Sequence, residues 1–171
     1  LWWQNVAIFY AGFSKDAPIL LDEIIEVGKN TIGIIPQFNV MTGLGRLMQS
    51  LYSTPINNRV EGVRLTSELA CSIVSDLITT KEEKFSMFKN FSRYGIYQML
   101  LAGFEISHHS ITLQEPLKLA FDKLSRSLEN SSDFSSSYQM FLIAATMGNC
   151  SFLNFQPYKY NLTHLNFYLP K

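Results

Sequence analysis

The stretch NRVEGVRLTSELACSIVSDLIT, residues 58–79, decides the fold class of this chain. Its apolar residues recur every three or four positions, a spacing that places them on one broad face of an α-helix. These residues are Val60, Val63, Leu65, Leu69, Ile73, Leu77 and Ile78. Pro55 breaks the chain before this helix. Because an isolated helix is marginal in water, its apolar face predicts a packed helical domain.

A helical hairpin is predicted on the N-terminal side of this helix. Residues 1–10 carry apolar side chains nearly all round, which predicts a helix that is buried on most sides. Gly12 is expected to end it as a C-cap, and Asp16 followed by Pro18 signals the start of the second helix. A third helix is expected to begin from an N-cap at Asn39, after a connector that contains glycine and proline.

More helices are predicted on the C-terminal side. Residues 81–104 hold large aromatic side chains at helical spacing, and such side chains dominate packing energy. Thr112 is expected to cap the next helix, with Glu115 at the capping-box position and Pro116 in the first turn. The serine-rich segment 129–137 favours a solvated loop, and a last helix is expected after it.

The order of these elements predicts an all-α fold. Helical hairpins in succession form either a bundle or a short α-solenoid of the tetratricopeptide or HEAT type. No fixed repeat period distinguishes the two. Residues 1–150 are expected to form one helical domain, and the aromatic tail 151–171 fits a short strand, a short helix or an irregular packed segment.

Composition and charge exclude some partners and favour others. Hydrophobic residues make up 47% of the 171 residues and charged residues only 16%, where a share of about 25% charged is usual. Some apolar surface is therefore expected to meet another domain of a parent chain, a protein partner or a second copy. The 14 basic and 14 acidic residues balance without a run of like charges, so nucleic acid is not an expected partner.

The lack of long apolar runs and the two cysteines indicate a cytoplasmic location. No apolar run reaches the roughly 18 residues that a membrane span needs, and residues 1–10 lack the basic segment of a signal peptide. Cys71 and Cys150 are expected to be free thiols in a reducing cytosol, with a disulfide between them as the alternative. Because the sequence starts inside an apolar helix, we expect it to be part of a longer chain.

The motifs of catalysis and of metal or cofactor binding are missing from the sequence. There is no GxxxxGK loop to cradle phosphates, no GxSxG elbow and no CxxC pair. The glycines of GLGR, residues 43–46, are better explained by a close helix crossing. His108 and His109 are adjacent, so on a helix they diverge by about 100° and cannot clamp one metal ion. No catalytic residue, metal site or cofactor is predicted.

Two stretches carry a resemblance to a known family. In WWQNVAIFYAGFSKDAPILLDEI, residues 2–24, a Trp-led helix ends in an Ala-Gly turn before Lys-Asp, and in GLGRLMQSLYSTP, residues 43–55, a Gly-Arg-Leu-Met-Gln core runs to a Thr-Pro stop. Both resemble the helical region C-terminal to the core of bacterial signal-transduction NTPases of the STAND and NACHT type. The resemblance implies a region that senses a ligand or partner and holds the core inactive; several bacterial members act in defence against phage.

The leading hypothesis is a non-catalytic helical interaction or sensor module. Its candidate interaction residues are Trp2, Trp3, Lys15, Asp16 and Arg46. The tryptophans are expected to pack in the core or against another domain, and an arginine on a glycine-bearing helix is suited to pair with a neighbouring domain's carboxylate.

Two alternatives stay open. One is an all-α enzyme or small-ligand-binding protein, in which the helix from Phe85 to Phe104 lines an apolar pocket with Glu105, His108 or His109 at its mouth. The other is a structural scaffold with a large apolar interface between copies.

Overall fold

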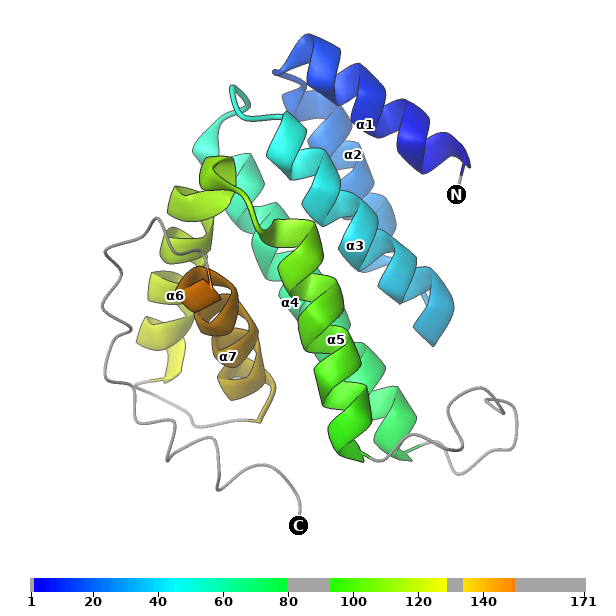
Figure 1. Cartoon of the computed structure of the whole chain (residues 1–171), viewed down its shortest axis with the longest axis vertical. Helices are drawn as coiled ribbons and strands as arrows, with labels where there is room; N and C mark the ends of the chain where they lie inside the picture. Colours follow the sequence, from blue (N-terminus) through cyan, green and yellow to red (C-terminus); the bar gives the residue numbers. More distant parts are fainter. Residues whose placement is uncertain (1, 80–92, 129–133, 150–171) are drawn as a thin grey trace.

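The computed structural model describes residues 2–79, 93–128 and 134–149, and in these ranges it is helical without any strand (Figure 1). The elements are α1 (Trp2–Ser14), α2 (Pro18–Lys29), α3 (Ile34–Ser50), α4 (Ile56–Thr79), α5 (Arg93–His108), the 3₁₀ helix η2 (Ile111–Leu113), α6 (Gln114–Leu128) and α7 (Phe134–Asn149). The predicted all-α fold is confirmed. No helix in the described ranges is long and apolar enough to cross a membrane.

The helices pack in two layers. In one layer α1 packs on α3, α3 on α5 and α5 on α7; in the other, α2 packs on α4 and α4 on α6. Figure 1 shows α1, α3 and α5 in front of α2 and α4. The result is a bundle in which successive hairpins stack, and α7 turns back to pack on α4 and α6 as well.

Helix α4, which contains residues 58–79, is the centre of the molecule. It packs on α2, α3, α5, α6 and α7, and Val60, Val63 and Ile73 are fully buried on it. Gly62 allows α3 to come close, because a Cβ at this position would lie 2.3 Å from Sδ of Met48. The amphipathic pattern of the sequence therefore identified the core helix.

The start of α3 differs from the prediction. The helix begins at Ile34, well before Asn39, and its N-cap is Gly33 with a φ of 96°. Glycine adopts this left-handed backbone without the steric cost that a Cβ would add. Pro36 lies in the first turn of α3, where backbone N–H groups have no intrahelical acceptor, so the N–H that proline lacks costs no hydrogen bond. Gly33 and Pro36 were the start signals, and Asn39 is an ordinary exposed helix residue.

The ends of α1 and α6 also differ from the prediction. Gly12 lies inside α1, and the residue with a left-handed backbone that follows the helix is Lys15, with a φ of 60°. Thr112 is part of η2, where its N–H donates to Oγ of Ser110 at 3.3 Å. Pro116 lies in the first turn of α6, as predicted.

The C-terminal predictions are partly outside the described residues. Helix α7 begins at Phe134, inside the predicted loop 129–137, so four residues of that loop are helical. Cys71 is buried on α4 and its thiol donates to the carbonyl of Ser135 at 3.4 Å. Residues 81–92, Cys150 and the tail 151–171 lie outside the described residues, so their predicted structure and pairing stay predictions.

Candidate interaction site at α1 and the α1–α2 turn

The turn between α1 and α2 holds two of the predicted interaction residues in a defined geometry. Lys15 takes the left-handed backbone that costs a residue with a Cβ about 1 kcal/mol or more. Its N–H donates to the carbonyl of Ala11 at 2.7 Å, and its carbonyl accepts from the N–H of Ser53 at 2.9 Å. Its ammonium lies 5.9 Å from the centre of the Tyr52 ring. Lys15 is therefore a turn residue held by the α3–α4 loop.

Thr54, in the same loop, fastens the other half of the turn. Its hydroxyl accepts from the N–H of Ala17 at 3.0 Å and donates to Oδ1 of Asp16 at 3.2 Å. Thr54 is buried although it is polar, and buried polar groups are normally hydrogen-bonded in this way. Asp16 thus holds the turn through Thr54, and α2 has no side-chain cap.

Arg59 of α4 extends these contacts across the end of the bundle. Its Nε donates to the carbonyl of Thr54 at 3.1 Å and its Nη1 to the carbonyl of Thr112 at 2.8 Å. The hydroxyl of Thr112 donates to the carbonyl of Gln49 at 3.0 Å. Partial burial lowers the pKa of Arg59, against the raising effect of the Glu115 carboxylate. The α1–α2 turn, the α3–α4 loop and the connection between α5 and α6 are therefore tied together at this end of the bundle.

Helix α1 packs on the bundle with two alanines and exposes four larger apolar side chains. Ala11 is fully buried and Ala7 packs against the core. The opposite side exposes 40% of Val6, 80% of Phe9, 56% of Tyr10 and 84% of Phe13. We call these four side chains the α1 face.

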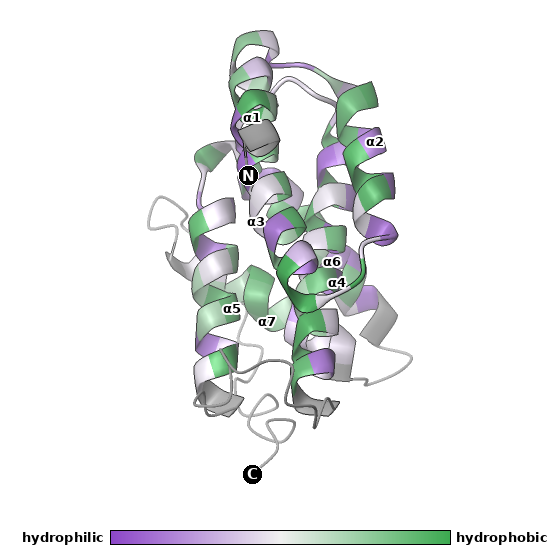
Figure 2. Cartoon of the chain, turned by 90° about the vertical axis from the view of Figure 1, so that its right-hand side faces the viewer, coloured by the Kyte–Doolittle hydropathy of each residue, from purple (hydrophilic) through white to green (hydrophobic). Residues whose placement is uncertain are grey.

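The α1 face is continuous because its members stand at i, i+3, i+4 and i+7, one side of a helix. Figure 2 shows apolar, green segments along α1 at the edge of the bundle. The sequence predicts burial of this helix on most sides, and the structure corrects that prediction. Among the described elements α1 packs on α3, and its outer side is open.

The remaining predicted interaction residues do not gather at this site. Trp2 and Trp3 belong to α1, but their side chains lie outside what the structure describes. Arg46 is exposed on α3, between the buried residues Gly45 and Leu47. Among the described residues, no side-chain hydrogen bond or ion pair of Arg46 is found.

The histidine that the pocket alternative places at a pocket mouth lies in the core. His108 is completely buried and stacks on Phe104, with ring centres 4.0 Å apart. Its Nδ1 lies 2.9 Å from the carbonyl of Phe104, and its Nε2 lies 2.9 Å from Oγ1 of Thr66. The carbonyl can only accept, so we assign the proton to Nδ1. A Cβ at Gly45 would lie 2.6 Å from the ring, so this glycine marks a close crossing of α3 and α5, as predicted.

The environment of His108 keeps the ring neutral. Burial lowers its pKa to about 4, against the raising effect of its bond to the Phe104 carbonyl. A neutral ring with both nitrogens engaged by protein groups is a structural element of the core. His109, in contrast, is exposed.

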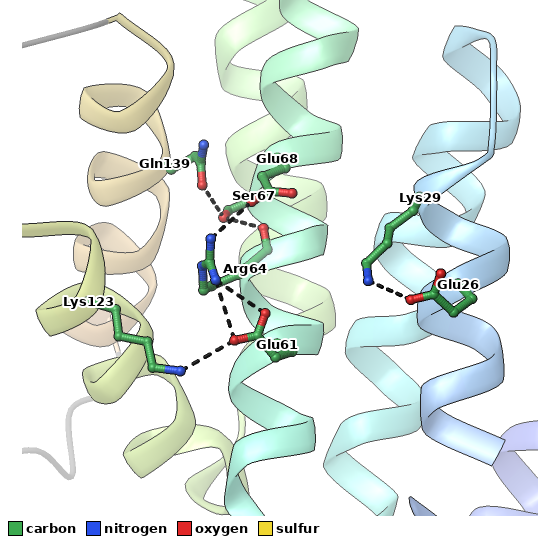
Figure 3. A network of polar contacts seen from close by, with 8 residues as sticks. All are labelled: Glu26, Lys29, Glu61, Arg64, Ser67, Glu68, Lys123 and Gln139. Carbon is green, nitrogen blue, oxygen red and sulfur yellow. Dashed lines mark hydrogen bonds and ion pairs between the residues drawn. The ribbon is translucent and has the colours of Figure 1, made fainter. Parts of the chain in front are cut away.

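The charged side chains of α2, α4 and α6 form balanced surface pairs (Figure 3). Arg64 lies 3.2 Å from Glu61 and 3.6 Å from Glu68, and Lys123 of α6 lies 3.3 Å from Glu61. Partial burial raises the pKa of Glu68, against the lowering effect of Arg64. Exposed pairs of this kind are worth little stability, about 0–1 kcal/mol each. Within this described cluster the two glutamates face one arginine and one lysine, so neither sign is in excess.

Sequence reasoning missed the α1 face, Thr54 and Arg59. The i, i+3, i+4, i+7 spacing of the α1 face was readable, but every side of this apolar helix looked suited for burial. Only the packing on α3 shows which side stays open. Thr54 bonds the N–H of Ala17 and Arg59 bonds the carbonyl of Thr112, and both partners are far away in the sequence, which leaves no motif.

Metal ligation and similarity to known proteins add no further site. Among the described residues, no group of three or more His, Cys, Asp or Glu side chains is placed to hold a metal ion. The chain matches no family model, no curated protein and no solved structure.

Proposed function

We propose that this chain is a non-catalytic helical interaction or sensor module, and that the α1 face is its docking surface. The observation that carries the proposal is the inverted packing of α1, which packs Ala7 and Ala11 against the core and exposes Phe9, Tyr10 and Phe13. A helix that served only its own bundle would bury the large apolar residues. Contiguous apolar patches of a few hundred Å² on soluble proteins are often functional.

The position of α1 in the stack supports the same proposal. Arrays of helical hairpins need a terminal helix with a polar outer side to stay soluble. Helix α1 has α3 on one side, and its 13 residues include no charged residue. The open side is therefore suited to receive a further helix, as the next element of the stack.

The expected partner is another domain of a parent chain, or a separate protein. The resemblance of residues 2–24 and 43–55 to STAND and NACHT proteins favours the NTPase core of such a parent. Regulation would follow from differential contact. The NTPase core and the α1 face can adopt more than one relative arrangement. A partner that binds one of these arrangements more tightly shifts the equilibrium between them towards that arrangement, by the difference in its binding free energy.

The experiment is a binding titration between this chain and the candidate NTPase core, with nucleotide hydrolysis as the second readout. We expect the double variant Phe9→Lys/Phe13→Lys to lose binding and the effect on hydrolysis. The matched control is Ile106→Lys, at an apolar residue of α5 that is 67% exposed and lies on a different helix from the α1 face. Unchanged binding by the double variant, or no effect of the wild-type chain on hydrolysis, would contradict the proposal.

A further inference from the structure

We propose that the α1 face also pairs with the α1 face of a second copy of this chain, in an antiparallel dimer. This inference does not depend on an NTPase partner, because it concerns the chain alone. The two partners use one surface, so only one of them occupies it at a time.

The positions of the four side chains are symmetric along the helix. Val6 and Phe13 stand at the two ends of the α1 face, and Phe9 and Tyr10 at its middle. A two-fold axis between Phe9 and Tyr10 therefore places Val6 of each copy opposite Phe13 of the other. A small side chain then faces a large one at both ends, and Phe9 faces Tyr10 at the centre, an aromatic pair of the kind that stabilises interfaces. A two-fold interface requires this kind of self-complementary patch.

The absence of charge on α1 permits the pairing. None of its 13 residues is Asp, Glu, Lys or Arg. Two α1 helices that pack on each other therefore contribute no like charges of their own, which would otherwise oppose association. The attraction is hydrophobic and needs no opposite charge on the partner surface.

The exposed area suits a weak dimer. Aromatic side chains bury about 150–250 Å² each, so Phe9, Tyr10 and Phe13 supply about 450 Å² per copy at their exposed fractions. With Val6 the two copies together approach about 1,000 Å², close to the lower limit of specific interfaces. We therefore expect a dissociation constant in the micromolar range.

The test is analytical ultracentrifugation of the 171-residue chain over a concentration series that spans the micromolar range. We expect a reversible monomer–dimer equilibrium for the wild type. Val6→Lys and Phe13→Glu should each weaken the dimer at least about tenfold, and Ile106→Lys should not. A wild type that stays monomeric at every concentration overturns the proposal, and so does a dimer that both α1 variants leave intact.

Mixing the two variants tests the antiparallel arrangement. A dimer of one Val6→Lys chain and one Phe13→Glu chain sets the new lysine opposite the new glutamate, and it keeps the original contact at the other end. We expect the mixture to associate more tightly than either variant alone. Equal association in the mixture and in the separate variants overturns the antiparallel pairing. Circular dichroism confirms folding, and the exposed positions of Val6 and Phe13 make both substitutions compatible with it.

Discussion

At the scale of the residue, the buried ring of His108 makes stability depend on pH. Its pKa is lowered to about 4 in the folded protein by burial, and it returns to about 6.5 when the chain unfolds. Between these values the unfolded state binds more protons, so stability rises with pH. The stabilisation is complete above the unfolded value and is lost as the pH falls towards 4.

The loss is measured by urea unfolding at a series of pH values. We expect the wild type to lose about 3 kcal/mol of unfolding free energy from this group between pH 6.5 and 4. His108→Gln cannot titrate, so its free energy should fall less over the same window. Parallel pH profiles for the two proteins would show that His108 is not the group responsible.

Two glycines on different helices should respond to alanine in opposite directions. At Gly45 a Cβ would lie 2.6 Å from the His108 ring and 2.8 Å from the backbone oxygen of Ser107. Overpacking of this kind costs about 1–3 kcal/mol. At Gly12, inside α1, a Cβ meets nothing within 4 Å, and alanine favours the helix by about 0.5–1 kcal/mol. Thermal unfolding should show a lower Tm for Gly45→Ala and a higher one for Gly12→Ala.

At the scale of the element, the α1–α2 hairpin depends on one hydroxyl. Thr54→Val removes the acceptor of the Ala17 N–H and the donor to Asp16. Leaving a buried or half-buried backbone N–H without a partner costs about 1–3 kcal/mol. We expect a loss of this size in chemical unfolding, together with faster amide exchange in residues 15–17.

The control for Thr54 is Thr42→Val on α3. The hydroxyl of Thr42 bonds carbonyls of its own helix, the shorter contact being with Phe38 at 3.0 Å. Removing this hydroxyl leaves no backbone N–H of another element without a hydrogen-bond acceptor, so the free energy of unfolding should change little. If both valine variants unfold at the same denaturant concentration, the bond to Ala17 does not hold the turn.

At the scale of the whole molecule, stability should fall from α4 to α1. Helix α4 packs on five other helices, whereas among the described residues α1 packs on α3 and places only Ala7 and Ala11 against the core. Regions with few buried apolar contacts open most easily. Hydrogen exchange of dilute protein should therefore be slowest in α4 and fastest in α1, and α1 should gain protection at concentrations where the chain dimerises. Equal protection of α1 and α4 in dilute protein would contradict this gradient.

The sequence by itself determined the helical class and most of the helices. The spacing of Val60, Val63 and Ile73 required one buried face, and that face is the centre of the core. Pro18 and Pro116 marked first turns correctly because proline constrains the backbone locally. Asn39, Gly12 and Thr112 failed as boundaries because neighbouring residues offered competing turns that only the packed chain selects.

Tertiary structure alone decided which apolar surface stays open. The residues of α1 looked suited for burial all round, and the choice of Ala7 and Ala11 as the packed side depends on how closely α1 approaches α3. Likewise, nothing local distinguishes His108 from the exposed His109; the space beside Gly45 and the hydroxyl of Thr66 make one of them a core residue. Local periodicity determines which helices form, but their contacts join residues that are distant in the sequence, so the site emerges only when the helices pack.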